Sequence, residues 1–291
     1  MRFLCFCPRL RRSGLTGAAS RMTLENPTPA RDYSTISPSA LSLLLMKSRS
    51  SIPFAKEAAK LLWGDSVPSE LGDATQVAGA LSRLRHFEAR YRSLDVLLQE
   101  LACSRVLEIG AGLSFRGLEL ARKSDTFYLD TDLPDMAAIK ADLLAKIHPG
   151  PLLGTLRVQA LNALDSAAFS AAIDDMPPGP VAIANEGLLP YLGEAEKTRL
   201  AANVRAALQA RGGVWLTADV YVRHEKGAAP TVGYGRSRKF LEQHRVEENK
   251  FANWDAAQKF FTTNGFSVVK KLAHHDPRHI RESWALAVAS D

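Results

Sequence analysis

The sequence is poor in cysteine and has no long apolar run. Its 291 residues include 3 cysteines, Cys5, Cys7 and Cys103, and their spacing fits neither a disulfide framework nor a zinc site. We therefore expect a reducing, cytoplasmic location and no bound metal. Since no apolar stretch approaches the ~20 residues of a membrane-spanning helix, the sequence predicts no membrane segment.

Acidic residues are absent from the first 21 positions, which carry five arginines. The net charge of the chain is +6, so the remainder is nearly neutral, and we expect no nucleic-acid partner. The Arg-rich start is either a transit peptide or an overlong gene start with Met22 as the first residue. Its poor helical amphipathicity favours the second. Residues 1–35 are predicted to form a disordered or targeting-like tail, and residues 36–291 one domain.

From residue 36 on, amphipathic segments and apolar runs predict an α/β fold with a mostly parallel sheet and helices on both faces. Three helices come first, from Pro38 to about Lys47, from after Pro53 to Trp63, and over 77–102. Seven strands follow, over 105–110, 126–130, 155–160, 181–185, 214–219, 267–271 and 284–289. The helices between them are expected over 114–123, 134–147, 166–174, 194–209 and 252–264. The last two strands are expected to form a hairpin, with Asp276-Pro277 in its turn.

A glycine-rich corner joins the first predicted strand to its helix. Gly110 and Gly112 follow the strand directly, and such glycines let a ligand approach the backbone at a helix N-terminus. The corner differs from the dinucleotide fingerprint because the third glycine, Gly117, comes two residues late. With the acid Glu108, it resembles the first motif of S-adenosylmethionine-dependent methyltransferases. The alternative interpretation is an ordinary tight strand-to-helix turn.

Acidic side chains follow two further strands at the edge where open α/β sheets bind ligands. Asp130 and Asp132 end the second strand, about twenty residues after the glycines, where an acid accepts hydrogen bonds from ribose hydroxyls. Asp132 could instead cap the helix that begins at Pro134. Glu186 follows the fourth strand and could accept hydrogen bonds from a ligand amino group or cap a helix.

Three motifs together resemble the leucine carboxyl methyltransferase family, which includes bacterial O-methyltransferases associated with polyketide biosynthesis. They are Gly-Ala-Gly-Leu-Ser-x-Arg from Gly110, Asp-Leu-Pro from Asp132, and Glu-Gly-Leu-Leu-x-Tyr-Leu from Glu186. The resemblance covers roughly residues 35–210. It implies a Rossmann-like class I methyltransferase fold, S-adenosylmethionine as the cofactor and a small-molecule substrate.

The resemblance also implies roles for further residues. Lys47, at the end of the first helix, and Arg90 stand where the family binds the methionine carboxylate. Asn162 and Ala163, after the third strand, are the candidates for adenine, although a solvent-facing turn explains them equally well. The family has an acid where Asn162 stands. After residue 220 the match fades. The region over 221–254 should cover the substrate, so the resemblance does not identify the substrate.

The sequence thus predicts an O-methyltransferase that acts on a carboxylate or hydroxyl of a small molecule. No histidine lies near the motifs to serve as a base, which favours a carboxylate because it is already ionised. The alternatives are a nucleotide-dependent oxidoreductase and a non-catalytic S-adenosylmethionine-binding module.

Two clusters of charged or metal-binding residue types are expected to have structural rather than catalytic roles. The histidines over 274–279 form a turn rather than a metal site, and Arg236–Lys239 forms a solvated face or a clamp for an acidic substrate. The sequence names no catalytic residue and leaves the oligomeric state open.

Overall fold

A computed structural model of the chain describes residues 32, 35, 38–64, 74–148, 150–223, 236–273 and 281–290, and at 38, 74–80 and 236–238 only the backbone. The chain divides into two units, Met1–Asp32 and Tyr33–Asp291. Every element discussed below belongs to the second unit. The histidine cluster and the expected turn at Asp276-Pro277 lie outside the described residues.

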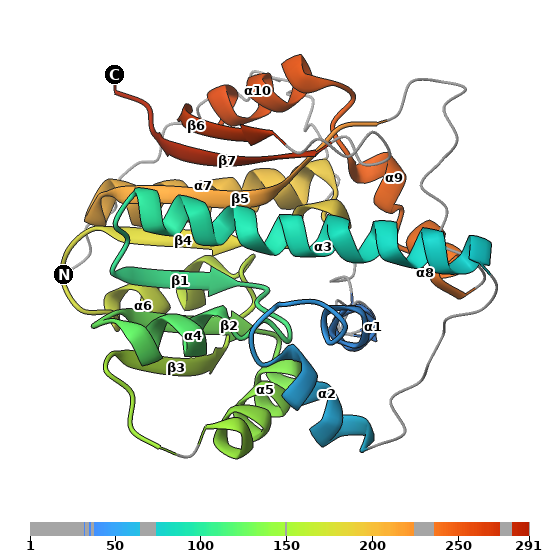
Figure 1. The fold of residues 1–291 in the computed structure, drawn as a ribbon. Coiled ribbons are helices and arrows are strands. Elements are labelled where there is room, and N and C mark those ends of the chain that lie inside the picture. The colour runs from blue at the N-terminus through green and yellow to red at the C-terminus, as the bar shows by residue number, and fades with distance from the viewer. Residues whose placement is uncertain are drawn as a thin grey trace, which may run out of the picture. The chain divides into compact units, whose positions relative to one another are not determined.

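The described strands form a seven-stranded sheet in the order β3-β2-β1-β4-β5-β7-β6 (Figure 1). The first five strands are parallel, and β7 runs antiparallel to both β5 and β6. The strands are β1 (Arg105–Ile109), β2 (Phe127–Asp132), β3 (Thr155–Ala160), β4 (Val181–Asn185), β5 (Gly213–Tyr221), β6 (Phe266–Ala273) and β7 (Arg281–Val288). The predicted α/β, Rossmann-like sheet and its terminal hairpin are confirmed.

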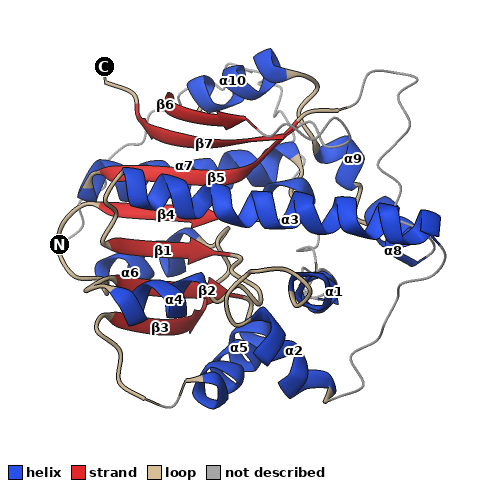
Figure 2. Cartoon of the chain, in the orientation of Figure 1, coloured by secondary structure: helices blue, strands red, loops and turns tan. Residues whose placement is uncertain are grey.

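Helices cover both faces of the sheet, so the strands form the middle layer (Figure 2). Helices α3 and α4 pack on one face, and α6, α7 and α10 pack on the other. The described helices are α1 (Pro38–Lys47), α2 (Ala55–Trp63), α3 (Ala74–Glu100), α4 (Arg116–Lys123), α5 (Pro134–Ile147), α6 (Ser166–Asp174), α7 (Glu194–Arg211), α8 (Arg236–Gln243), α9 (Val246–Asn249), α10 (Trp254–Thr263) and the short 3-10 helix η2 (Leu189–Tyr191). None of the described helices is long and apolar enough to cross a membrane.

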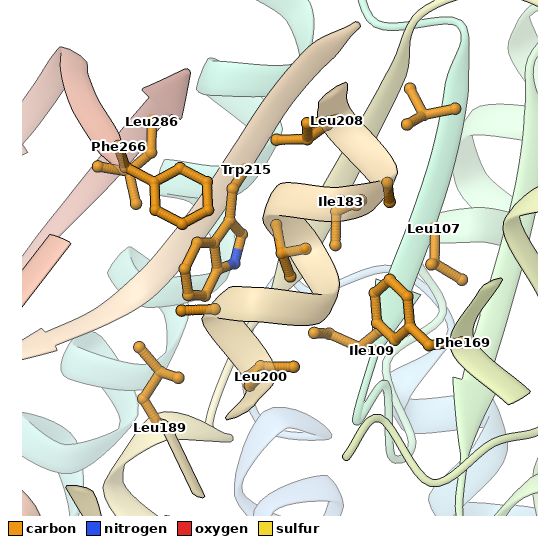
Figure 3. Packing of buried hydrophobic residues seen from close by; sticks show 14 of the residues in the cluster. Leu107, Ile109, Phe169, Ile183, Leu189, Leu200, Leu208, Trp215, Phe266 and Leu286 are labelled. Atoms are coloured by element: carbon orange, nitrogen blue, oxygen red, sulfur yellow. The ribbon is translucent and has the colours of Figure 1, made fainter. Parts of the chain in front are cut away.

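The two-residue repeat of the strands decides which side chains meet which helices. Leu107 and Ile109 of β1 pack against α6 and α7, whereas Val106 packs against α3. On the face covered by α6 and α7, the Trp215 ring meets Phe261 and Phe266 edge-on, with ring centroids 5.4 and 5.2 Å from its own. Figure 3 shows this packing from close by.

Most predicted elements are observed with small shifts of their ends. The bounds of β3, β4, α5 and α6 are as predicted, and β5 continues two residues further, to Tyr221. The prediction missed α8 and α9. Helix α8 has the sequence RSRKFLEQ, in which only Phe240 and Leu241 are apolar, so it shows no helical stripe. The segment Arg236–Lys239, which was expected to form a solvated face or a clamp, lies in this helix.

Candidate functional site

A cavity opens at the carboxyl edge of the parallel strands, with about 1000 Å³ of empty space, open solvent included. The loops after β1, β2, β3 and β4 line it, together with α1 and Arg90 of α3. Eight of the ten predicted site residues line this cavity: Lys47, Arg90, Gly110, Gly112, Asp132, Asn162, Ala163 and Glu186. Glu108 and Asp130 do not belong to its lining.

The glycine corner needs its glycines. Gly110 and Gly112 have φ angles of 61° and 49°, in the left-handed region that other residues rarely adopt. A Cβ atom at Gly110 would lie 3.3 Å from the Leu188 side chain, and one at Gly112 would lie 3.4 Å from Ala40. The corner therefore packs closely against both the loop after β4 and helix α1, and both glycines line the cavity.

Asp132 ties this corner to the second strand. Its carboxylate accepts hydrogen bonds from the backbone N–H groups of Gly112 and Leu133, each over 2.7 Å. Burial raises the pKa of Asp132, and the two backbone donors oppose that rise. Helix α5 has Leu133 as its N-cap residue and receives no side-chain cap, so Asp132 is not the helix cap. A carboxylate has about four lone-pair positions, so Asp132 can accept further hydrogen bonds.

Asp130 was predicted beside Asp132 but lies two residues further inside the sheet. Its carboxylate is 2.8 Å from the Lys140 ammonium of α5, and both side chains are 1% exposed. Burial raises the pKa of Asp130 to about 6, although the charge of Lys140 lowers it. Because β2 extends to Asp132, only the later acid reaches the edge of the sheet. Of the two acids predicted at the ribose, Asp132 alone lines the cavity.

Glu108 was predicted at the ligand but lies beneath the cavity. Its side chain points to the face covered by α3 and α4, where it accepts a hydrogen bond from Arg116 Nη1 over 2.6 Å and another from the Tyr128 hydroxyl. It is 1% exposed. The side chain is directed inward because Glu108 shares the strand face of Val106, which packs against α3. Any effect of Glu108 on a ligand must therefore pass through another residue.

Glu186 lies at the centre of a buried cluster of charges. Its Oε1 atom accepts hydrogen bonds from Lys47 Nζ over 2.9 Å and from Arg90 Nε over 3.2 Å. Its Oε2 atom accepts one from Arg116 Nη2 over 2.8 Å. Burial alone would raise the pKa of Glu186, but the three cations outweigh it and hold this pKa well below its ordinary value. Burial lowers the pKa of Lys47, although Glu186 opposes this.

The turn after Glu186 is held by Asp219, a residue that was not predicted to belong to the site. The Asp219 carboxylate accepts hydrogen bonds from the backbone N–H groups of Gly187 over 2.7 Å and Leu188 over 2.8 Å, and from the Asn185 side chain over 2.7 Å. Gly187 has a φ angle of 83°. Asp219 could have been noticed because it is the acid at the end of the strand predicted over 214–219, as Asp130 ends the strand predicted over 126–130.

Two further residues near Arg90 were also missed. Arg90 Nη1 donates to the Tyr221 hydroxyl over 3.4 Å, and this hydroxyl lies 3.0 Å from His86 Nε2. Which of these two atoms donates depends on the tautomer of His86. His86 therefore lies close to Arg90, but none of the described residues that line the cavity is a histidine. The available signal was spacing, because His86 and Arg90 are four residues apart and share one face of a helix.

The loop after β3 is fixed by hydrogen bonds of its own. The side-chain oxygen of Asn162 accepts from the backbone N–H of Leu164 over 3.0 Å. The carbonyl of Ala163 accepts from the Asn203 side chain of α7 over 2.9 Å. Asn162 is exposed at the cavity, in agreement with both interpretations made of it, an adenine contact and a solvent-facing turn.

No protein-family model matches the chain. A protein of Mycobacterium avium (strain 104), named "Putative S-adenosyl-L-methionine-dependent methyltransferase", is 31% identical over an alignment of 151 residues, and the match covers 48% of this chain and 48% of that protein. A protein of Parafrankia sp. (strain EAN1pec) with the same description is 30% identical over an alignment of 146 residues, and the match covers 48% of this chain and 47% of that protein. The chain spans about half the length of the curated relatives it matches.

Among solved structures, the chain is similar to a magnesium protoporphyrin IX methyltransferase from Synechocystis PCC 6803 with bound SAH. The two are 11% identical, and the match covers 82% of this chain and 96% of the other, with a TM-score of 0.47.

Proposed function

We propose that the chain is an S-adenosylmethionine-dependent methyltransferase that methylates an oxygen of a small molecule, as its resemblance to the leucine carboxyl methyltransferases implies. The observation that carries the proposal is the single cavity in which the glycine corner, Asp132 and the Glu186 charge cluster meet. The names of the two bacterial relatives support the same cofactor.

The lining residues suit the chemical groups of this cofactor, which has a zwitterionic amino acid head and no phosphate. Glu186 would accept hydrogen bonds from the ammonium, and Lys47 and Arg90 would bind the carboxylate. Asp132 has acceptor capacity left for the ribose hydroxyls. Asn162 and Ala163 would contact adenine.

Bound in this way, the cofactor supplies a methyl group that its sulfonium already activates. What the protein must then contribute is alignment of the acceptor oxygen with that methyl group and exclusion of water, and such positioning can lower a barrier by roughly 7–11 kcal/mol. A carboxylate acceptor needs no base at neutral pH. A hydroxyl acceptor does need one, and none of the described residues that line the cavity is a histidine, which favours the carboxylate.

An oxidoreductase remains the alternative of a different class, because one fold can serve several chemistries. The sheet argues against it, because dinucleotide-binding sheets have the strand order 3-2-1-4-5-6, whereas here an antiparallel β7 lies beside β5. Gly117 serves the packing of the protein itself. A Cβ there would lie 2.6 Å from the Tyr128 ring, so this glycine lets α4 lie close to the sheet.

Calorimetric titration of the full chain tests the cofactor. We expect S-adenosylhomocysteine to bind and NAD not to bind, and the reverse result would favour the oxidoreductase. Incubation with labelled S-adenosylmethionine and matched panels of carboxylic acids and phenols, read by mass spectrometry, then tests the acceptor. Binding without transfer to any member of either panel would favour a non-catalytic module.

A further inference from the structure

We propose that Arg116 is a positioning residue that fixes and orients the Glu186 carboxylate, and that Glu108 acts on the cofactor site only through Arg116. This inference rests on the proposed function. It gives a role to the arginine that ends the Gly-Ala-Gly-Leu-Ser-x-Arg motif. It also gives a different role to the acid that precedes the glycines.

The two oxygen atoms of Glu186 have different partners. Oε1 accepts from Lys47 and Arg90, both of which line the cavity. Oε2 accepts from Arg116, which is 1% exposed and is not part of the cavity lining. One oxygen therefore faces the ligand side, and the other faces the interior of the protein.

The remaining contacts of Arg116 hold it in place. Its Nε donates to Asp95 over 2.8 Å and its Nη1 to Glu108 over 2.6 Å, while Nη2 also donates to the Tyr91 carbonyl over 3.1 Å. The guanidinium carbon lies 4.1 Å from the centre of the Tyr91 ring. A planar guanidinium with this many fixed partners cannot turn without breaking several charged hydrogen bonds.

The two oxygen atoms of Glu186 would act differently when a ligand binds. When an amino acid head enters, its ammonium needs Oε1, and its carboxylate needs the two cations that now share Oε1. Lys47 and Arg90 can therefore pass from Glu186 to the ligand. Arg116 stays on Oε2 throughout, so Glu186 remains ionised and its free oxygen remains directed at the ammonium.

Glu108 completes the chain of contacts. It accepts from Arg116 on one side and from Tyr128 on the other, so its charge balances the guanidinium and helps to fix its plane. Replacing Glu108 by glutamine preserves the shape of the side chain and removes the charge. The effect should reach the ligand through Arg116 and Glu186.

The test compares two ligands of the full-length protein, S-adenosylhomocysteine and 5′-methylthioadenosine, which lacks the amino acid head. We expect Arg116→Met to weaken S-adenosylhomocysteine binding by about tenfold or more, the value of a charged hydrogen bond, and to leave methylthioadenosine binding unchanged. Glu108→Gln should also weaken S-adenosylhomocysteine binding relative to methylthioadenosine binding, by a smaller factor. A purely structural role would change both affinities together or neither.

Arg92→Met is the matched control, because Arg92 also pairs with Asp95, over 3.3 Å, yet its side chain is 43% exposed. It should bind both ligands as the unaltered protein does. If Arg116→Met does not fold, Glu108→Gln decides the matter alone. Normal S-adenosylhomocysteine binding by the folded variants would overturn this inference and leave the proposed function standing. Failure of the unaltered protein to bind it would overturn both.

Discussion

The ammonium of Lys47 and the carboxylate of Glu186 form a buried hydrogen bond of 2.9 Å between α1 and the loop after β4, although 139 residues separate them. Both side chains line the same cavity. In the proposed complex they would bind opposite ends of the amino acid head. The pair therefore offers one charge of each sign at the cavity, as an amino acid head with an ammonium and a carboxylate requires.

Replacing Glu186 by glutamine should weaken cofactor binding and also lower stability. The variant keeps the shape of the side chain but leaves Lys47, Arg90 and Arg116 without the carboxylate they share. Removing one partner of a buried ion pair typically costs about 3–5 kcal/mol. Calorimetry with S-adenosylhomocysteine and urea unfolding measure the two losses, and unchanged values of both would remove Glu186 from the site.

Arg90→Ala should weaken S-adenosylhomocysteine binding by roughly 1.5–3 kcal/mol, the value of a charged hydrogen bond. Arg90 is expected to bind the ligand carboxylate in a two-pronged geometry, which Lys47 cannot provide. Titration of the folded variant measures the loss. An unchanged dissociation constant would mean that Arg90 only joins α3 to Glu186 and Tyr221.

The parts of the fold that were predictable from the sequence are those with strong local patterns. Strand β4 is apolar over its first four residues, and α5 begins with proline in its first turn, so their bounds follow from neighbouring residues. Helix α8 has no such pattern. The sequence also left both Asp130 and Asp132 as candidates, because which of them reaches the edge depends on where β2 stops, and β2 pairs with β3 up to Asp132.

The candidate site was predictable as a set of strand ends but not as a network. The cluster around Glu186 depends on how α1, α3 and α4 dock on the sheet, which no local pattern encodes. Arg116 was visible in the motif, yet its contact with Glu186 spans 70 residues. The same holds for His86 and Tyr221, which are 135 residues apart.

Asp219→Asn should destabilise the protein. In the native structure, Oδ1 accepts from Gly187 N–H, while Oδ2 accepts from Leu188 N–H and from the Asn185 side chain. An amide has one oxygen, so the donors at one of the two positions would lose their acceptor and face an N–H₂ group instead. A buried donor without an acceptor costs about 1–3 kcal/mol. Urea unfolding measures the loss, and equal stability would show that the turn holds without this carboxylate.

The buried pair of Asp130 and Lys140 should leave a mark on the pH dependence of stability. The folded-state pKa of Asp130 is raised to about 6, whereas an unfolded aspartate titrates near about 3.9. Between these values the folded protein keeps a proton that the unfolded chain has released. The contribution of Asp130 to the free energy of unfolding therefore falls as the pH rises from about 4 to 6.

The double variant Asp130→Asn, Lys140→Met lacks this titration and keeps a side chain of similar size at each position. Its stability relative to the unaltered protein should rise across the same pH window, as urea unfolding at several pH values would measure. A difference that stays constant with pH would contradict the raised pKa.

Gly187→Ala should weaken cofactor binding, because this glycine lies against Arg90. Its φ angle is 83°, and a Cβ atom there would lie 3.1 Å from Arg90 Nη2, so the guanidinium would have to shift. Gly212→Ala is the matched control. Its φ and ψ angles are 70° and 177°, so alanine is strained there as well, by roughly 1–3 kcal/mol, but the added Cβ meets nothing within 4 Å. Both variants should therefore lose thermal stability, whereas only Gly187→Ala should bind S-adenosylhomocysteine less tightly. Equal dissociation constants for the two variants would show that the position of Arg90 does not limit binding.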